Sequence, residues 1–229
     1  MNTIATRLAN IHQRIQDAAI KYGRSSNAIQ LLAVSKTRPT EDVQSALDAG
    51  QYYFGESYLQ EAIEKIQQIA DPHAQWHFIG RIQSNKTKII AEHFNWVHGL
   101  CSFKHAQRLN DQRSISMPPL NVCLQINLSN EKSKAGITPE EAFDMAHMIH
   151  ELPRLHLQGL MTLPAPAETL EQQREPFRAL RELRDSIKTK EYPLETLSMG
   201  MSGDLEAAIA EGATIVRIGT AIFGPRNKK

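Results

Sequence analysis

Residues 29–50, IQLLAVSKTRPTEDVQSALDAG, contain the pattern that decides the fold. The first part is a short apolar run that TRPT ends, and it predicts a buried strand. Thr40 then precedes an amphipathic segment that closes at Gly50, which predicts a capped helix with a glycine terminator. A strand followed directly by a helix is the repeating unit of parallel α/β sheets.

The same unit recurs along the chain. Further candidate strands are QYYF (51–54), QWHFIG (75–80), WVHGL (96–100), LNVCLQINL (120–128), LHLQGLMTL (155–163), TLSMG (196–200) and TIVRIG (214–219). Several segments between them repeat apolar residues every three or four positions, as amphipathic helices do. Eight strands alternating with helices favour one (β/α)₈ barrel of the TIM type over an open sheet. An extra helix begins the chain, and we expect residues 1–229 to form a single domain.

The composition is that of an ordinary globular protein, with 41% hydrophobic and 22% charged residues. A net charge of +1 argues against a broadly basic surface for nucleic acid. The sequence shows neither a membrane span nor the apolar core of a signal peptide. Cys101 and Cys123 lie in unrelated segments, and neither they nor the histidines have the spacing of a metal site. We therefore expect a cytoplasmic protein with reduced thiols, no metal, and no nucleic-acid or membrane partner.

Lys36 follows the apolar run LLAVS and is the first candidate for chemistry. Barrels build their sites at the carboxyl ends of their strands, so this amine would lie at the barrel mouth. Partial burial there would lower the pKa of Lys36 and yield the neutral amine that attacks aldehydes. A lysine that simply leaves the strand for water fits the same residues, and type and position alone do not decide between the two.

Two segments near the end of the chain have the layout of a phosphate site. SMGMSGDLEAAI places Ser202 and Gly203 directly before a predicted helix, and Gly219 and Thr220 follow the last strand. Free backbone amides at a helix start bind anions, and the loops after strands seven and eight of barrels recurrently bind phosphate. Taken singly, Ser202 could be only a helix cap and Gly219 only a turn. Asp204 would repel a phosphate, so we expect its side chain to point away or to cap locally.

Other polar residues fall at predicted strand ends. Arg217 interrupts the apolar run TIVRIG and needs a partner inside the barrel mouth, either an interior carboxylate or a ligand. Gly55, Glu56 and Ser57 lie in a loop expected after the second strand, and Lys86 lies in GRIQSNKTK after the third. Ser57 fits a helix cap equally well.

These positions together resemble the pyridoxal phosphate homeostasis protein family (the YggS/PROSC group), a relative of the barrel domain of alanine racemase. The matching segments are LLAVSKT, FGESYLQE, WHFIGRIQSNK, GLMTL, SMGMSGDLEAAI and VRIGTAIFG, in this order over essentially the whole chain. The resemblance implies a fold type III barrel that binds pyridoxal 5'-phosphate (PLP). By this likeness Lys36 corresponds to the Schiff-base lysine, and Arg217 to the arginine that faces the pyridine nitrogen. Ser202, Gly219 and Thr220 correspond to phosphate contacts.

Two positions depart from the family pattern. The family usually has FGEN where this chain has Ser57, and MSDD where it has Gly203. Serine is shorter than asparagine, so we expect this substitution to weaken or remove a contact to the ring hydroxyl of the cofactor or to the lysine. We keep both as cofactor-binding candidates and rank Ser57 below the others.

The resemblance implies a protein that binds, buffers and delivers PLP, with apo PLP-dependent enzymes as recipients. An arginine at the pyridine nitrogen disfavours ring protonation and weakens the cofactor as an electron sink. The chain also ends too soon after the last strand for the second domain of a racemase. We expect no catalytic residues and a monomer. Two alternatives stay open: a PLP-dependent amino-acid racemase with Lys36 as its base, and a class I aldolase-like barrel without PLP.

Overall fold

A closed barrel of eight parallel strands forms the centre of the protein in the computed structural model, which describes residues 3–129 and 135–225. The strands are β1 (Gln30–Val34), β2 (Tyr53–Glu56), β3 (Gln75–Phe78), β4 (Trp96–Leu100), β5 (Leu120–Gln125), β6 (Leu155–Met161), β7 (Thr196–Ser198) and β8 (Ile215–Ile218). Each pairs with its neighbour in sequence, and β8 pairs with β1, so the sheet has no free edge. The predicted (β/α)₈ barrel is confirmed.

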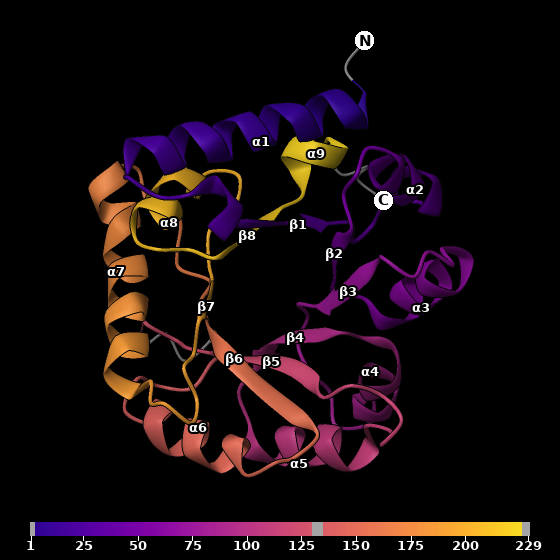
Figure 1. Cartoon of the computed structure of the whole chain (residues 1–229), viewed down its shortest axis with the longest axis vertical. Helices are drawn as coiled ribbons and strands as arrows, with labels where there is room; N and C mark the ends of the chain where they lie inside the picture. Colours follow the sequence, from indigo (N-terminus) through magenta and orange to yellow (C-terminus); the bar gives the residue numbers. More distant parts are fainter. Residues whose placement is uncertain (1–2, 130–134, 226–229) are drawn as a thin grey trace.

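Helices surround the barrel in a ring (Figure 1). They are α1 (Ile4–Lys21), α2 (Thr40–Asp48), α3 (Leu59–Gln68), α4 (Thr87–His93), α5 (Phe103–Gln112), α6 (Ala142–His150), α7 (Leu170–Ile187), α8 (Leu205–Ala210) and α9 (Thr220–Phe223), with a 3-10 turn at Ser26–Ala28. The first, α1, is the extra N-terminal helix, and it packs across α8 and α9 (Figure 1). None of the described helices combines the length and apolar character needed to cross a membrane.

Most strand residues are apolar because one face of the sheet lines the barrel interior and the other meets the helices. All four residues of β8 are buried, including Arg217. Gly159 shows how closely the strands approach one another, since a Cβ atom at this position would lie 1.9 Å from the carbonyl oxygen of Thr196. Only glycine fits β6 at this point against β7.

The second strand begins two residues later than expected, at Tyr53. Gly55 and Glu56 therefore belong to β2, and the prediction that they lie in the following loop was wrong. Gln51 is buried before the strand, and its side-chain amide donates to the carbonyl oxygens of Leu31 and Tyr53 at 3.0 and 2.7 Å. Through these two hydrogen bonds, the Gln51 side chain links β1 to β2.

The expected cap at Thr40 is also wrong. Thr40 is the first residue of α2, Pro39 occupies the cap position, and the Thr40 hydroxyl donates instead to Gln68 of α3 at 2.7 Å. The proline side chain has no hydrogen-bond acceptor, so α2 begins without a side-chain cap, and Glu41 and Asp42 place negative charge in its first turn instead. Gly50 does end the segment as predicted, with a φ of 87°.

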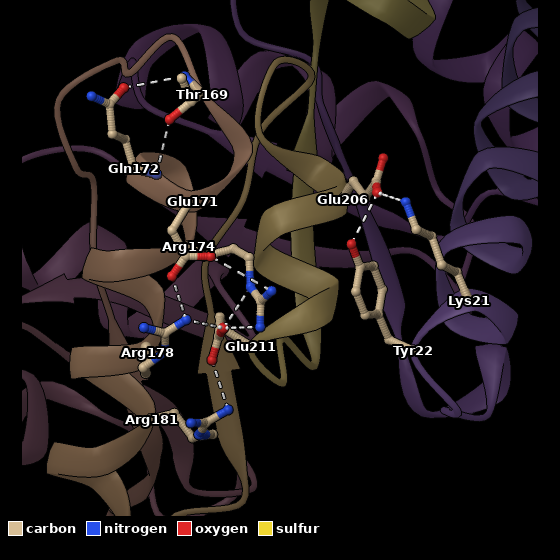
Figure 2. A network of polar contacts seen from close by, with 10 residues as sticks. All are labelled: Lys21, Tyr22, Thr169, Glu171, Gln172, Arg174, Arg178, Arg181, Glu206 and Glu211. Atoms are coloured by element: carbon tan, nitrogen blue, oxygen red, sulfur yellow. Dashed lines mark hydrogen bonds and ion pairs between the residues drawn. The ribbon is translucent and has the colours of Figure 1, made fainter.

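Ion pairs on the outside of the barrel attach α1 and α7 to the α8 segment (Figure 2). Glu206 accepts from Lys21 Nζ at 2.7 Å and from the Tyr22 hydroxyl at 3.0 Å. The buried Glu211 carboxylate, directly after α8, accepts from three arginines of α7: Arg174, Arg178 and Arg181. Contacts with α1 at Glu206 and with α7 at Glu211 therefore hold α8 in place, and with it the loop that precedes this helix.

Candidate functional site

A cavity of about 320 Å³ lies at the carboxyl ends of β1, β6, β7 and β8. Six of the seven predicted site residues line it: Lys36, Ser202, Gly203, Arg217, Gly219 and Thr220. Residues that sequence reasoning missed complete the lining: Val34, Arg38, Ile79, Met161, Leu163 and Met201. The carboxyl-terminal face is where barrels place their sites, so the cavity has the expected location.

Lys36 follows β1 and is half-buried in the wall of this cavity. Its Nζ atom donates a hydrogen bond to the Ser57 hydroxyl at 3.4 Å. Ser57 itself lines an adjoining cavity of about 490 Å³, together with Tyr58, Arg81 and Lys86. The serine that replaces the family asparagine therefore still reaches the lysine, although it does not line the same cavity.

The backbone that carries Lys36 forms a tight turn. The Arg38 amide donates to the Ser35 carbonyl at 3.1 Å, and Thr37 has a φ of 64°. A positive φ at the third position of such a turn favours glycine or asparagine, whereas threonine is β-branched and strained there. Strain of this kind costs about 1–3 kcal/mol and persists only where surrounding contacts enforce it. The turn is also attached at its end, because Arg38 donates to the carbonyl oxygens of Gly224 and Pro225.

Charged residues lie buried beside this turn. Lys65 of α3 is 2% exposed, and its ammonium donates to Glu56 at 2.8 Å, to Glu61 at 2.5 Å and to the Ser35 carbonyl at 2.7 Å. Burial raises the pKa of Glu56, while the charge of Lys65 opposes that shift. One oxygen of Glu56, Oε2, has no hydrogen-bond partner among the described residues. We call Glu56, Glu61 and Lys65 the Lys65 cluster.

The loop between β7 and α8 brings Ser202 and Gly203 to the cavity. Arg14 of α1 donates to the Ser202 carbonyl at 3.1 Å. The Asp204 carboxylate turns back to the loop and accepts from the Met201 amide at 2.5 Å, and burial raises the pKa of Asp204. A Cβ atom at Gly203 would meet nothing within 4 Å, so the loop backbone does not require glycine there.

The eighth strand delivers the other two residues of the predicted anion site. Gly219 occupies the cap position of α9, and Thr220 is the first residue of that helix. A Cβ atom at Gly219 would lie 3.2 Å from the Val34 carbonyl oxygen, which brings the start of α9 close to β1. Both residues line the cavity with Ser202, so the two loops do converge.

Arg217 is 5% exposed and holds a fixed position under the cavity. One terminal nitrogen donates to the Ser198 carbonyl at 2.5 Å and hydroxyl at 2.8 Å, and the other to the Thr162 carbonyl at 2.9 Å. Among the ion pairs of the described residues, none involves Arg217, so the alternative of a paired interior carboxylate is not observed. Burial lowers the pKa of Arg217 to about 10, which leaves the guanidinium charged at neutral pH.

Two buried histidines extend this polar chain into the barrel, and sequence reasoning missed them. His98 Nδ1 lies 2.7 Å from the Ser198 hydroxyl, and His98 Nε2 lies 2.9 Å from His77 Nδ1. Burial lowers the pKa of His77 to about 3 and the pKa of His98 well below its ordinary value. Both are therefore neutral at physiological pH. Each occurs in a predicted strand, and a polar residue within such a strand was the available signal.

The donor set suits a small anionic aldehyde with an aromatic ring. A half-buried amine, two hydroxyls, the backbone of two loops and one guanidinium surround the same cavity, while Ile79, Leu163 and Met201 supply apolar surface. In the described part of the chain, no group of three His, Cys, Asp or Glu side chains has the arrangement of a metal site. Cys101 and Cys123 are free thiols, and burial raises the pKa of Cys123 to about 12.

Comparison with known proteins adds the family. Residues 7–227 match the family described as alanine racemase, N-terminal domain. The pyridoxal phosphate homeostasis protein of Escherichia coli (strain K12) is 50% identical over 230 residues, covering 99% of this chain and 98% of the relative. The solved structure of PipY from Synechococcus elongatus with PLP bound has a TM-score of 0.86 at 33% identity, and the match covers 97% of this chain and 100% of PipY.

An alanine racemase of Clostridium difficile shares the fold, with a TM-score of 0.75 at 16% identity; the match covers all of this chain and 58% of the racemase. The full-length relatives are far more similar than this enzyme, and their match leaves almost none of the chain uncovered. The protein is therefore a member of the pyridoxal phosphate homeostasis protein family, built on the alanine racemase N-terminal barrel.

Proposed function

We propose that this protein holds PLP in the 320 Å³ cavity as an imine on Lys36, and that it buffers and delivers the cofactor inside the cell without strong catalytic activity. One observation carries the proposal: the Lys36 amine lines the same cavity as Arg217 and the two loops that contain Ser202 and Thr220. Related proteins named for PLP homeostasis, and PipY with PLP bound, support the identity of the ligand.

Each residue has a defined task in this proposal. The Lys36 amine attacks the aldehyde carbon, a C=N bond replaces the C=O bond, and one water molecule leaves. The hydroxyls of Ser202 and Thr220, with the backbone at Gly203 and Gly219, hold the phosphate. Ser57 accepts a hydrogen bond from the lysine and orients the amine.

Arg217 limits the chemistry. PLP when bound supplies an aldehyde carbon and a ring that withdraws electrons best when its nitrogen is protonated. A guanidinium carries donors only and remains charged, so next to the pyridine nitrogen it opposes protonation there. Its bonds to Ser198 and Thr162 prevent it from turning away. This arrangement favours storage of the cofactor over racemisation of amino acids.

The proposal also covers the domain organisation, the oligomeric state, the cellular location and the recipients of the cofactor. Residues 1–229 act as one domain, the protein is a monomer in the cytoplasm, and apo PLP-dependent enzymes receive the cofactor. The relatives are named as homeostasis proteins, which agrees with a role other than catalysis.

The imine is tested on purified protein incubated with PLP. We expect a visible absorption band that shifts on borohydride reduction, and a pyridoxyl adduct on Lys36 in the peptide map. Lys36→Ala should lose both the band and the adduct, while Lys86→Ala, which changes a lysine of the adjoining cavity, should retain them. A colourless protein without an adduct would reject the proposal and favour the aldolase-like alternative.

Transfer is tested separately from binding. Loaded protein is mixed with an apo PLP-dependent enzyme, and recovery of that enzyme's activity is followed beside an assay of amino-acid racemisation. We expect transfer without racemisation. Sustained racemisation that Lys36→Ala abolishes would instead assign the protein to the racemase alternative.

A further inference from the structure

The turn that carries Lys36, residues 35–38, is the lysine turn, and residues on both sides of Lys36 bond to the Lys65 cluster. On one side, the Ser35 carbonyl accepts from Lys65 at 2.7 Å and the Ser35 hydroxyl donates to Glu56 at 2.7 Å. On the other side, the Thr37 amide donates to Glu61 at 2.6 Å. These three contacts come from β2 and α3, elements that adjoin the turn but do not contain it.

We infer that the Lys65 cluster positions the lysine turn, so that Glu61 and Lys65 act as positioning residues for the amine of Lys36. The inference rests on the proposed imine and deepens it. A threonine at a φ of 64° does not stay in that conformation by preference, so a contact at its amide is needed to hold it. Glu61 supplies that contact, and Lys65 holds Glu61 in place at 2.5 Å.

The energetics of burial support a positioning role. Three ionisable groups packed together at a barrel mouth contribute little net stability, because desolvation offsets most of their attraction. Hydrophobic residues of the same volume would serve a purely structural purpose equally well. Carboxylate and ammonium groups, however, can bond directly to backbone N–H and C=O groups and so fix a turn in one conformation. In this chain they do so on either side of Lys36.

The test compares three variants on the same helix. Glu61→Ala removes the acceptor of the Thr37 amide, and because the Glu61 side chain is 29% exposed, the variant is expected to fold. Glu61→Gln keeps an oxygen acceptor at that position and serves as the conservative rescue. Glu64→Ala removes an exposed glutamate of the same helix and is the matched control.

Two measurements are made on the ligand-free proteins. The first is the rate at which the visible band forms after PLP is added, at equal protein concentration. We expect Glu61→Ala to react about tenfold more slowly, because misplacing a reacting group by a fraction of an ångström to one ångström costs up to about 100-fold. Glu61→Gln and Glu64→Ala should react at the parental rate. The second is amide hydrogen exchange over residues 35–38, which should accelerate in Glu61→Ala alone.

The outcomes separate this inference from the proposed function. If Glu61→Ala forms the band at the parental rate with unchanged exchange, or if Glu64→Ala is equally slowed, the inference is overturned. If the parent protein forms no band but exchange accelerates only in Glu61→Ala, the proposed function fails while the positioning of the turn stands.

Discussion

The two sides of the cavity are attached to the protein in different ways. On the Lys36 side, the lysine turn bonds to Lys65 and Glu56, which are almost completely buried, and to Glu61, which is half-buried. On the Ser202 side, the loop before α8 is held by Arg14, by the pair of Lys21 with Glu206, and by three α7 arginines that pair with the buried Glu211 directly after α8 (Figure 2).

This difference has an energetic meaning. Removing one partner of a buried ion pair leaves a charge without solvent and is strongly destabilising, whereas water replaces the partner of an exposed pair. The amine therefore lies on a part of the barrel that tolerates little change. The loop proposed to hold the phosphate depends on the exposed pair of Lys21 with Glu206 and on arginines that are 28% to 37% exposed and can regain water, so we expect it to adjust at smaller cost.

Lys65→Met gives the largest expected effect. It leaves Glu56 and Glu61 as neighbouring carboxylates without their shared cation, and we expect a loss of about 3–5 kcal/mol in the free energy of unfolding. The measurement is denaturant unfolding followed by circular dichroism. The double variant Lys65→Met with Glu56→Gln should recover part of the loss, since the buried negative charge is then absent. A loss below about 1 kcal/mol in the single variant would show that the cluster is effectively solvated.

Acid should have the second largest effect, because it lowers the stability of the fold through two buried histidines of the barrel interior. His77 has a pKa of about 3 in the folded protein, and His98 is also shifted well below the ordinary value of 6.5. Below pH 6.5 the unfolded chain binds protons that the folded protein does not, so stability falls as the pH falls from about 6.5 towards 3. The slope is at most about 1.4 kcal/mol per pH unit for each histidine. Unfolding curves at a series of pH values measure it.

A matched pair of variants assigns that slope. His77→Phe keeps an aromatic ring against Trp96 and removes one titrating group, so the pH dependence of stability should weaken. His12→Gln changes an exposed histidine of α1 and serves as the matched control. A slope in His77→Phe equal to that of the parent would mean that His77 does not resist protonation.

Glu211→Gln should have a smaller effect than Lys65→Met. The carboxylate is 1% exposed, but its three arginine partners are 28% to 37% exposed and regain water when the charge is lost. We expect a loss of about 2 kcal/mol in the free energy of unfolding, the scale of charge-assisted hydrogen bonds. Glu171→Gln, at an exposed position of the same network, is the control. A loss as large as that of Lys65→Met would remove the distinction between the two sides.

Glu206→Gln should have the smallest effect. Its partner Lys21 is exposed, so salt screens the pair, and the thermal unfolding midpoint should be unchanged at high ionic strength. Any effect at low ionic strength should disappear as salt is added. A salt-independent decrease would show that α1 depends on this contact.

The sequence predicted the barrel and most of the cavity because both depend on local signals. Apolar runs alternate with amphipathic segments, and Lys36, Ser202 and Thr220 each follow a strand, at the end where barrel sites form. The family resemblance added the cofactor. Arg38 was missed although it lies only two residues after Lys36, because a charged residue in a turn usually faces solvent.

Contacts between distant segments were harder to predict. Lys65 and Glu56 lie in different elements, and only the packing of α3 against the ends of β1 and β2 makes them neighbours. One signal was available, because Lys65 stands three residues after the buried Ala62, on the apolar face of its helix. The start of β2 was misplaced because QYYF is uniformly suited to a strand, and no local residue marks where pairing with β1 begins.

The pairing of β1 with β8 also has a consequence for the order in which the protein acquires its function during synthesis. Lys36 leaves the ribosome well before Ser202, Arg217 and Thr220, because about 165 residues separate Lys36 from Ser202. A ligand that needs both ends of the chain cannot be bound by the nascent protein. Under the proposed function, each new copy can therefore take up PLP only after β8 has emerged and paired with β1.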